Sequence, residues 1–304
     1  MVEVIDLNGR GVHQALNAFG DGHVIGISGA SADRESIFPP LNNARTYKGR
    51  VVIGADGAGS VVARSLGLPG VPPEHAFMGV RGYWRGVGGL GDHIELFFID
   101  QVLPGYFWIF PMGDGTANVG LGILNSDIKK RNEHPNKILL NAIAKHPALA
   151  ARFTGAKQEG HIGAWIIPNG SHARPNSGDG WVLVGDAASL VDPFSGEGVG
   201  NALSSGQFAA NTINEALGKN PGSGPLPAAS LAPYSALVES KLRPEIMTSY
   251  NLQRASRSKF LLNLFIGQAA TKPAFRQMII DMLASDEAKQ QVKDPLFYLK
   301  LLLP

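Results

Sequence analysis

Two aspartates in this chain each follow a short apolar stretch and stand next to glycine. Asp56 lies in VVIGADGAGSVVAR, residues 51–64, and Asp186 lies in GWVLVGDAASLVDPFSGEGVGNAL, residues 180–203. Apolar runs of this length are typical of strands buried on both faces of a parallel sheet. At the carboxyl edge of such a strand, a carboxylate can accept ribose hydroxyls while glycine backbone closes on a phosphate. Each segment therefore predicts part of a nucleotide site, although a plain strand–turn–helix with Asp56 as a turn former also fits the first.

The second segment continues into Gly196, Gly198 and Gly200, which open a predicted helix over residues 198–217. A helix start without side-chain cover presents free backbone N–H groups and partial positive charge, which suit an anion. Glycine also leaves room for a flat ring or a pyrophosphate. The plain alternative is a glycine-rich helix start selected for close packing. Glu197 lies in the same loop, where it could either donate a proton or stabilise the helix start.

A third segment, LPGYFWIFPMGDGTANVGLGIL, carries aromatic side chains at alternate positions. A strand would place Tyr106, Trp108 and Phe110 on one face, and Phe107 and Ile109 on the other. An aromatic face of this kind is either a sheet-packing core or the wall of an apolar pocket. Taken alone, the strand favours the core.

Other kinds of chemistry find little support in the composition. The chain has no cysteine, which excludes disulfides, thiolate catalysis and cysteine-ligated metals and fits a cytoplasmic protein. The eight histidines form no H-x-x-x-H pair, so no metal site is indicated, and a formal charge of +2 gives no reason to expect nucleic acid. No segment approaches the roughly 20 apolar residues of a membrane span.

One glycine motif points away from the site. GVGGLG, residues 86–91, satisfies the dinucleotide pattern G-x-G-x-x-G, which should follow a strand and open a helix. Residues 93–98 instead predict a strand, so we interpret the motif as a hairpin loop.

The elements that must position these residues form a mixed α/β pattern. Buried or alternating strands are predicted over residues 2–7, 24–27, 50–54 and 180–185, with a hairpin turn at Asp21–Gly22. Residues 94–99, 106–110 and 118–124 are expected to form one antiparallel sheet. Helices are predicted over residues 135–153 and 198–217 and after Pro233, with a loop at 219–229. This pattern predicts a nucleotide-binding domain that is interrupted by an antiparallel domain.

The two glycine–aspartate segments closely resemble the two inner fingerprints of the FAD-dependent hydroxylase and reductase superfamily. The aromatic segment resembles the substrate-domain signature of its geranylgeranyl reductases, a Tyr-x-Trp-x-Phe-Pro run followed by Asn-Val-Gly-x-Gly. Many members have one more residue between the first proline and the tyrosine than this chain has between Pro104 and Tyr106.

The resemblance implies FAD, with Asp186 on the flavin-side ribose, Asp56 near the pyrophosphate, and the Gly198 and Val199 amides at the pyrimidine edge of the flavin. The implied cofactor site comprises Asp56, Gly57, Gly185, Asp186, Pro193, Gly196, Gly198 and Val199. The implied substrate wall comprises Tyr106, Trp108 and Phe110, and no catalytic acid is assigned.

The resemblance also implies a two-domain flavoprotein fold with an inserted antiparallel sheet domain. Residues 1–70 and 176–220 would belong to the FAD-binding domain, residues 71–175 to the substrate domain, and residues 221–304 to a C-terminal helical region. The superfamily begins with a βαβ unit that carries G-x-G-x-x-G, and residues 1–50 contain no such motif. We therefore expect a truncated N-terminus without that unit; a second chain that supplies it is the alternative.

The implied activity is reduction of C=C bonds in a prenyl chain of a lipid, chlorophyll precursor or menaquinone, with NADPH or ferredoxin as the electron donor. The alternatives are a monooxygenase or halogenase of the same superfamily, whose halogenases carry Trp-x-Trp-x-Ile-Pro at the aromatic run, or a non-catalytic lipid-binding fragment. Residues 241–304 contain ten Lys/Arg and five Asp/Glu beside apolar stretches. They could make peripheral contact with an anionic membrane or pack on their own domain.

Overall fold

The computed structural model describes residues 2–6, 24–27, 45–273 and 276–277. The turn predicted at Asp21–Gly22 lies outside these residues, as does the apolar C-terminal stretch of the chain. Strand β1 (Val2–Asp6) pairs antiparallel with β3 (Arg45–Gly49) as a separate two-stranded sheet.

The two glycine–aspartate segments meet in a four-stranded sheet. Its order is β10 (Ser177–Gly178), β11 (Trp181–Leu183), β4 (Val51–Gly54) and β2 (Val24–Ile27). Both β2 and β11 run parallel to β4, and β10 runs antiparallel to β11. The prediction of buried strands around residues 51–54 and 181–183 is therefore confirmed, and the two strands are direct neighbours.

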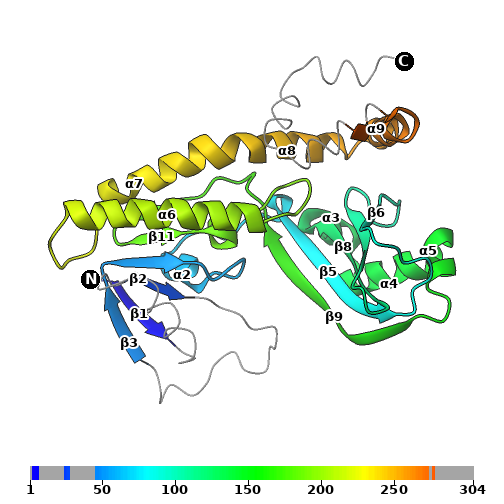
Figure 1. The fold of residues 1–304 in the computed structure, drawn as a ribbon, viewed down its shortest axis with the longest axis horizontal. Helices are drawn as coiled ribbons and strands as arrows, with labels where there is room; N and C mark the ends of the chain where they lie inside the picture. The colour runs from blue at the N-terminus through cyan, green and yellow to red at the C-terminus, as the bar shows by residue number, and fades with distance from the viewer. Residues whose placement is uncertain (1, 7–23, 28–44, 274–275, 278–304) are drawn as a thin grey trace.

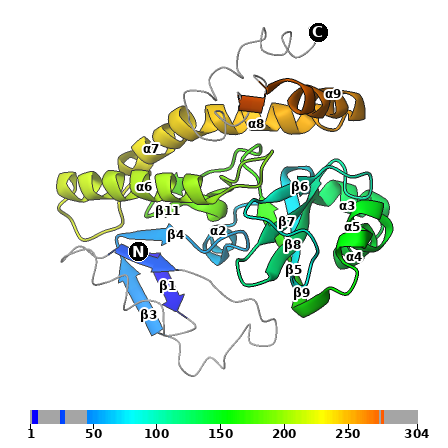
Figure 2. The same cartoon turned by 45° about the vertical axis from the view of Figure 1, so that its right-hand side comes forward.

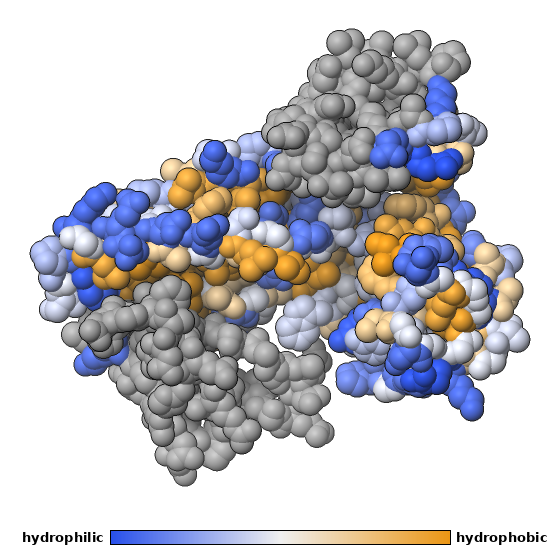
Figure 3. Space-filling view, viewed as in Figure 1, coloured by the Kyte–Doolittle hydropathy of each residue, from blue (hydrophilic) through white to orange (hydrophobic). Residues whose placement is uncertain are grey.

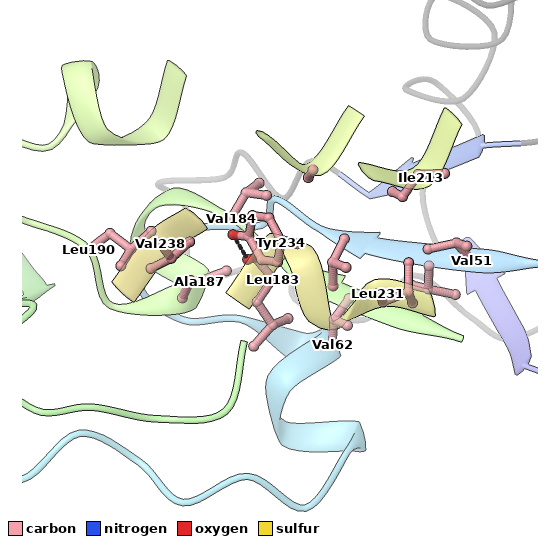
Figure 4. Close-up of a cluster of buried hydrophobic side chains, with 14 of the residues drawn as sticks. Val51, Val62, Leu183, Val184, Ala187, Leu190, Ile213, Leu231, Tyr234 and Val238 are labelled. Atoms are coloured by element: carbon pink, nitrogen blue, oxygen red, sulfur yellow. Dashed lines mark hydrogen bonds between the residues drawn. The ribbon is translucent and has the colours of Figure 1, made fainter. Parts of the chain in front are cut away.

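Two long helices pack over β4 and β11. These are α6 (Val199–Lys219) and α7 (Ala228–Leu237), which lie side by side above the sheet in Figures 1 and 2. The core beneath them contains the fully buried Leu183, Ile213 and Leu231. Within it the hydroxyl of Tyr234 donates a 2.5 Å hydrogen bond to the Leu183 carbonyl oxygen (Figure 4). This bond fixes α7 on the strand that carries Asp186.

A second sheet is antiparallel and has five strands. Its order is β6 (Glu95–Phe97), β7 (Tyr106–Pro111), β8 (Thr116–Leu124), β5 (Ala76–Arg85) and β9 (Lys157–Pro168). The three strands expected to share one antiparallel sheet do so. Strand β5, except for its first residue, falls within residues 77–124, which the sequence predicts to contain strands. Strand β9 was not anticipated, because it is an exposed edge strand without an apolar alternation.

Helices cover one face of this second sheet. They are α3 (Asn125–Arg131), α4 (Pro135–Lys145) and α5 (Pro147–Arg152), and they enclose a core that includes Phe107 and Ile109. The single helix predicted over residues 135–153 is wrong in one respect. The backbone of His146 is extended, as the residue before a proline prefers, so Pro147 begins a new helix.

The hairpin expected at residues 86–91 is also wrong. Strands β5 and β6 are not neighbours, so these glycines form a crossover between them. Arg152 holds the crossover, because its guanidinium donates to the carbonyl oxygens of Gly88 and Gly89 and forms a 2.5 Å ion pair with Glu95.

The C-terminal helices connect the two sheets. After α7 the chain continues through a π-helical turn (Val238–Leu242) into α8 (Arg243–Ala255) and α9 (Lys259–Thr271). The corner between α8 and α9 contacts the part of the chain that contains the five-stranded sheet through two ion pairs. These join Arg257 to Asp127 at 3.0 Å and Lys259 to Asp100 at 2.6 Å. The prediction of helices after Pro233 is confirmed for the described residues, although α7 already begins at Ala228.

Candidate functional site

The parallel strands β4 and β11 deliver both aspartates to one edge of the sheet. Gly54 pairs with Leu183 in register, and the amide of Val184 donates a 3.0 Å hydrogen bond to the Gly54 carbonyl oxygen. A Cβ at Gly54 would overlap the Leu183 side chain, so only glycine permits this approach. Asp56 and Asp186 follow within three residues of this pair and therefore lie at the same carboxyl edge, as predicted.

One carboxylate oxygen of Asp56 accepts hydrogen bonds from the adjacent helix. Its Oδ2 accepts from the amides of Val61 at 2.6 Å and Val62 at 3.1 Å, at the start of α2 (Val61–Ser65). Its Oδ1 is buried and has no hydrogen-bond partner among the described residues. Gly57 follows with a φ of 75°, a backbone conformation that glycine adopts without strain. The pair thus forms a rigid turn with one carboxylate oxygen still available.

Asp186 has a different environment. It lies in the short 3₁₀ turn Gly185–Ala188 and is partly buried. Its backbone carbonyl oxygen accepts from the Ser189 amide, but its carboxylate receives no hydrogen bond from any described residue. Burial, and secondarily the charge of Glu197, raise the pKa of its carboxyl above the ordinary value. A Cβ at Gly198 would lie 3.1 Å from the Asp186 Oδ1, which places this carboxylate beside the start of α6. An unsatisfied, partly buried carboxylate is costly and suits a ligand that brings hydroxyl donors.

The loop between Asp186 and α6 is closed by its own hydrogen bonds. Asp192 Oδ1 accepts from the amides of Phe194 at 2.9 Å and Ser195 at 2.7 Å, and the buried Pro193 lies between. The amide of Gly196 donates to the Asp192 carbonyl oxygen, and Gly196 adopts a φ of 74°. The loop is therefore preorganised without any ligand.

Glu197 stabilises the helix start. Its Oε1 accepts a 2.8 Å hydrogen bond from the amide of Gly200, in the first turn of α6. Of the two roles that the sequence leaves open for Glu197, this contact is the loop-stabilising one.

The beginning of α6 presents backbone rather than side chains. The helix has no side-chain cap at Gly198, and no described group accepts a hydrogen bond from the Gly198 or Val199 amides. Gly185, at a φ of 55°, lets the strand end approach the helix, because a Cβ there would lie 3.0 Å from the Ala202 Cβ. Val199 and Leu203 are each 71% exposed, and Figure 3 shows apolar side chains along this side of α6. The helix start thus combines free amides with an apolar rim.

Tyr106 joins this loop to the five-stranded sheet. Its hydroxyl donates to the carbonyl oxygen of Ser195, and a Cβ at Gly196 would lie 3.3 Å from the same hydroxyl. The ring centroids of Tyr106 and Trp108 are 5.9 Å apart, and those of Trp108 and Phe110 are 5.8 Å apart. The predicted aromatic face therefore exists as a continuous ladder that begins at the loop and leads away from it along β7.

Both polar atoms of the first two ladder residues are satisfied within the protein. The Trp108 Nε1 donates a 3.0 Å hydrogen bond to Asn118 Oδ1, and the Tyr106 hydroxyl is bound to Ser195. The indole lies flat over β8, since a Cβ at Gly120 would overlap the Trp108 ring. The ladder therefore offers ring faces and no unpaired donor.

A further segment at this site was not anticipated from the sequence. Asn169 forms a parallel bridge with Val191, and the amide of Gly170 donates a 2.8 Å hydrogen bond to the Val191 carbonyl oxygen. The Arg174 guanidinium lies 3.5 Å from the Ser189 Oγ, and burial lowers its pKa. The segment carries no motif, so only its position between β9 and β11 could have indicated it.

Comparisons with known proteins find a family model, curated sequences and solved structures that are similar to this chain. Residues 90–157 match the family model described as the geranylgeranyl reductase catalytic domain. The chain is 34% identical over 174 residues to a menaquinone reductase of Mycobacterium tuberculosis, covering 54% of this chain and 41% of that protein. It is 32% identical over 200 residues to digeranylgeranylglycerophospholipid reductase 2 of Methanopyrus kandleri, covering 65% of this chain and 47% of that protein.

Part of this chain is therefore similar to proteins of the geranylgeranyl reductase family. The chain spans about half the length of the curated relatives it matches. Among solved structures, a geranylgeranyl bacteriochlorophyll reductase-like protein from Thermoplasma acidophilum superposes with a TM-score of 0.65 at 23% identity, covering 83% of this chain and 60% of that one. A flavin-dependent brominase superposes with a TM-score of 0.62 at 19% identity, covering 86% and 65%. These likenesses show that this chain shares its fold with both proteins.

The Tyr106 contact makes a testable prediction about pH. Burial, with a smaller contribution from Asp192, raises the pKa of the Tyr106 hydroxyl from 10.0 to about 12. The folded state therefore favours the neutral phenol, so its contribution to stability is complete below pH 10 and is lost as the pH rises through about 12. In a spectrophotometric titration of tyrosinate, we expect one phenol to ionise near pH 12 and Tyr106→Phe to remove that step. A Tyr106→Phe protein with an unchanged titration curve would contradict the contact.

Proposed function

We propose that this chain forms part of an FAD-dependent reductase that hydrogenates C=C bonds of a geranylgeranyl-type chain. The observation that carries the proposal is the contact of Tyr106 with Ser195, which joins an apolar aromatic ladder to a glycine-rich loop beside a free carboxylate. A cofactor and a hydrocarbon bound at these two places would be in contact. On the same grounds we propose that residues 1–70 and 176–220 belong to the cofactor domain, residues 71–175 to the substrate domain, and residues 221–304 to the helical region.

The residues at the sheet edge fit FAD. Asp186 has two oxygens without donors, which suits the hydroxyls of a ribose, and Asp56 keeps one buried oxygen without a partner. Gly57 has open space beside it, and Gly185, Gly196 and Gly198 allow neighbouring groups to approach the backbone closely, while buried Pro193 shapes the loop. The free Gly198 and Val199 amides at the start of α6 suit the electron-rich edge of the flavin ring. Asp186 would hold the ribose on the flavin side, and the turn at Asp56 would lie near the pyrophosphate.

The aromatic ladder fits a prenyl chain. An unsaturated hydrocarbon offers only dispersion and π contacts, and the rings of Tyr106, Trp108 and Phe110 supply these without an unsatisfied polar atom. Bound reduced FAD would supply the hydride, and a proton must reach the other carbon to complete the addition. The protein's own part is to hold the double bond at the Tyr106 end of the ladder and to exclude water. Glu197 is engaged with α6, so we do not assign it as the proton donor.

The family relatives suggest a lipid as the source of the prenyl chain. One of them is named for a glycerophospholipid and another for menaquinone. No helix among the described residues is long and apolar enough to cross a membrane. Helix α9 nevertheless exposes Phe260 by 73% and Leu261 by 42% beside the cationic Lys259. We propose that this helix makes peripheral contact with the bilayer that contains the substrate.

The experiment that tests the function is anaerobic turnover. The protein is loaded with FAD, the flavin is photoreduced, and geranylgeranyl diphosphate or a geranylgeranylated lipid is added. We expect the oxidised flavin spectrum to return, with a product that has gained two hydrogen atoms for each flavin oxidised. A flavin that reoxidises only when oxygen enters, through a hydroperoxide, would instead support the monooxygenase or halogenase alternative. NADPH and reduced ferredoxin are then compared as electron donors.

The Asp186 carboxylate makes a second prediction. We expect Asp186→Asn to weaken FAD binding by about tenfold, because a charge-assisted hydrogen bond to a ribose contributes on the order of 1.5–3 kcal/mol. We also expect the unliganded variant to be at least as stable as the wild type. The raised pKa means that the folded state disfavours the ionised carboxyl at neutral pH, and the amide removes this cost. Titration with FAD and chemical denaturation measure the two effects.

Asp179→Asn is the matched control, since Asp179 lies near the other end of β11 and accepts a 2.7 Å hydrogen bond from the Ala228 amide. FAD affinity should be unchanged in this control. Asp186→Asn with normal FAD affinity, or with a destabilised fold and no specific loss of affinity, would remove Asp186 from the cofactor site.

A further inference from the structure

The face of the five-stranded sheet that carries the aromatic ladder continues beyond it as a tract of glycines. The register across the sheet places Tyr106 opposite Gly122, Gly122 opposite Gly79, and Gly79 opposite Trp165. Directly paired residues of an antiparallel sheet share a face, so these four form one row. The Trp165 side of this row belongs to the edge strand β9, where Trp165 is 57% exposed. The two central positions contribute no side chain of their own, and the Ile167 side chain lies over Gly79, where a Cβ would come within 2.9 Å of it.

The neighbouring row contains a single charge. It runs from Trp108 through Gly120 to Arg81 and ends at Gly163. Arg81 is exposed, and the residues paired with it on both sides are glycines. A Cβ at Gly163 would meet nothing within 4 Å. The guanidinium therefore lies on the same face as the Trp108 indole, which covers Gly120, and the surface beside Arg81 is open on the Gly163 side.

Arg81 has no acidic partner among the described residues. Its guanidinium carbon lies 4.9 Å from the centroid of the Tyr83 ring, a cation–π contact that orients the group without neutralising it. Arg85, which lies on the same face of the same strand, differs in this respect. It forms an ion pair with Glu159 at 2.5 Å and a longer one with Asp114 at 3.8 Å. The nearest acidic groups of this face thus pair with Arg85, and the Arg81 donors remain available.

We propose that Arg81 binds the phosphate of an anionic head group attached to the prenyl chain. The proposal rests on the proposed function and deepens it, because it selects phosphate-headed prenyl substrates over neutral ones. A guanidinium offers five donors in a planar fork that matches phosphate oxygens, and its cation–π partner fixes that plane. The open side at Gly163 leaves room for the head group, and the hydrocarbon would lie over the Trp108 indole on the other side of Arg81.

The position of Arg81 sets the direction of the substrate. Two strand spacings separate Arg81 from Trp108, which is about 10 Å. The indole lies over the strand between them, so a chain attached to a head at Arg81 would cross the Trp108 ring. Tyr106, which contacts the cofactor loop, lies one row further along. The head would be held away from the cofactor, and a double bond along the chain would reach it.

Ligand binding to the wild type, Arg81→Gln and Arg85→Gln tests this assignment. Three probes are titrated against intrinsic tryptophan fluorescence: geranylgeranyl diphosphate, a digeranylgeranylglycerol phosphate lipid in detergent, and neutral geranylgeraniol. We expect Arg81→Gln to weaken binding of a phosphate-headed probe by about tenfold or more and to leave geranylgeraniol unchanged. Arg85→Gln should leave all three affinities unchanged, since its charge is already paired.

The two phosphate probes identify the source of the phosphate. If Arg81→Gln loses affinity only for the diphosphate, the ligand of Arg81 is a free prenyl diphosphate. If it loses affinity only for the lipid, the ligand is a phospholipid head group. If it loses affinity for both, Arg81 binds phosphate in general. Equal losses for the neutral probe, an equal effect of Arg85→Gln, or no effect of Arg81→Gln would overturn the assignment. A wild-type protein that binds none of the probes would overturn the prenyl-chain function itself, which separates the two failures.

Discussion

Strands β4 and β11 pair in parallel, with Gly54 opposite Leu183, and the rest of the site takes its position from this pairing. The contact is possible because Gly54 has no side chain, and it is held from above by Tyr234 of α7. Parallel strands end at the same edge, so the pairing brings Asp56 and Asp186 together although their segments are far apart in the sequence. It also aims the chain after β11 at the start of α6, where Gly185 packs against Ala202.

The second constraint is the contact between the two sheets. The Tyr106 hydroxyl donates a hydrogen bond to the Ser195 carbonyl oxygen, and this contact fixes the loop before α6 against β7. The α8–α9 corner adds two ion pairs from the C-terminal side, through Arg257 and Lys259. On the proposed function, an interface fixed at several points would hold the cofactor and the hydrocarbon in one orientation, as reaction at a specific double bond requires. The aromatic ladder and the loop before α6 are thus joined by the Tyr106 contact.

Local patterns were sufficient to predict much of this arrangement. The two all-apolar runs before glycine and aspartate predicted buried strands, and alternation along residues 106–110 predicted which rings share a face. The sequence also predicted the helix from residue 199, because glycines precede a run of helix-forming residues. These features depend on neighbours within a few positions, where periodicity and steric rules apply directly.

Features that depend on distant partners were missed. Strand β9 is exposed and has no periodic pattern, so its pairing with β5 gives no local signal. The same holds for the crossover at residues 86–91, whose conformation is set by Arg152 on a remote helix. The Asp56 contact with α2 was not anticipated, and the Glu197 contact with Gly200 was one of two plausible roles that only the folded backbone distinguishes. The cofactor and substrate assignments of the site residues stay predictions.

The most direct test of the central claim is whether a bound flavin lies against the aromatic ladder. In the FAD-loaded protein, a tryptophan in contact with the flavin ring quenches its fluorescence by electron transfer. We expect Trp108→Phe to increase the emission of the bound flavin and to lengthen its lifetime. Trp84→Phe should change neither, because Trp84 lies in the core on the opposite face of the same sheet. Equal emission from the wild type and both variants, at equal flavin occupancy, would show that the loop and the ladder do not form one site.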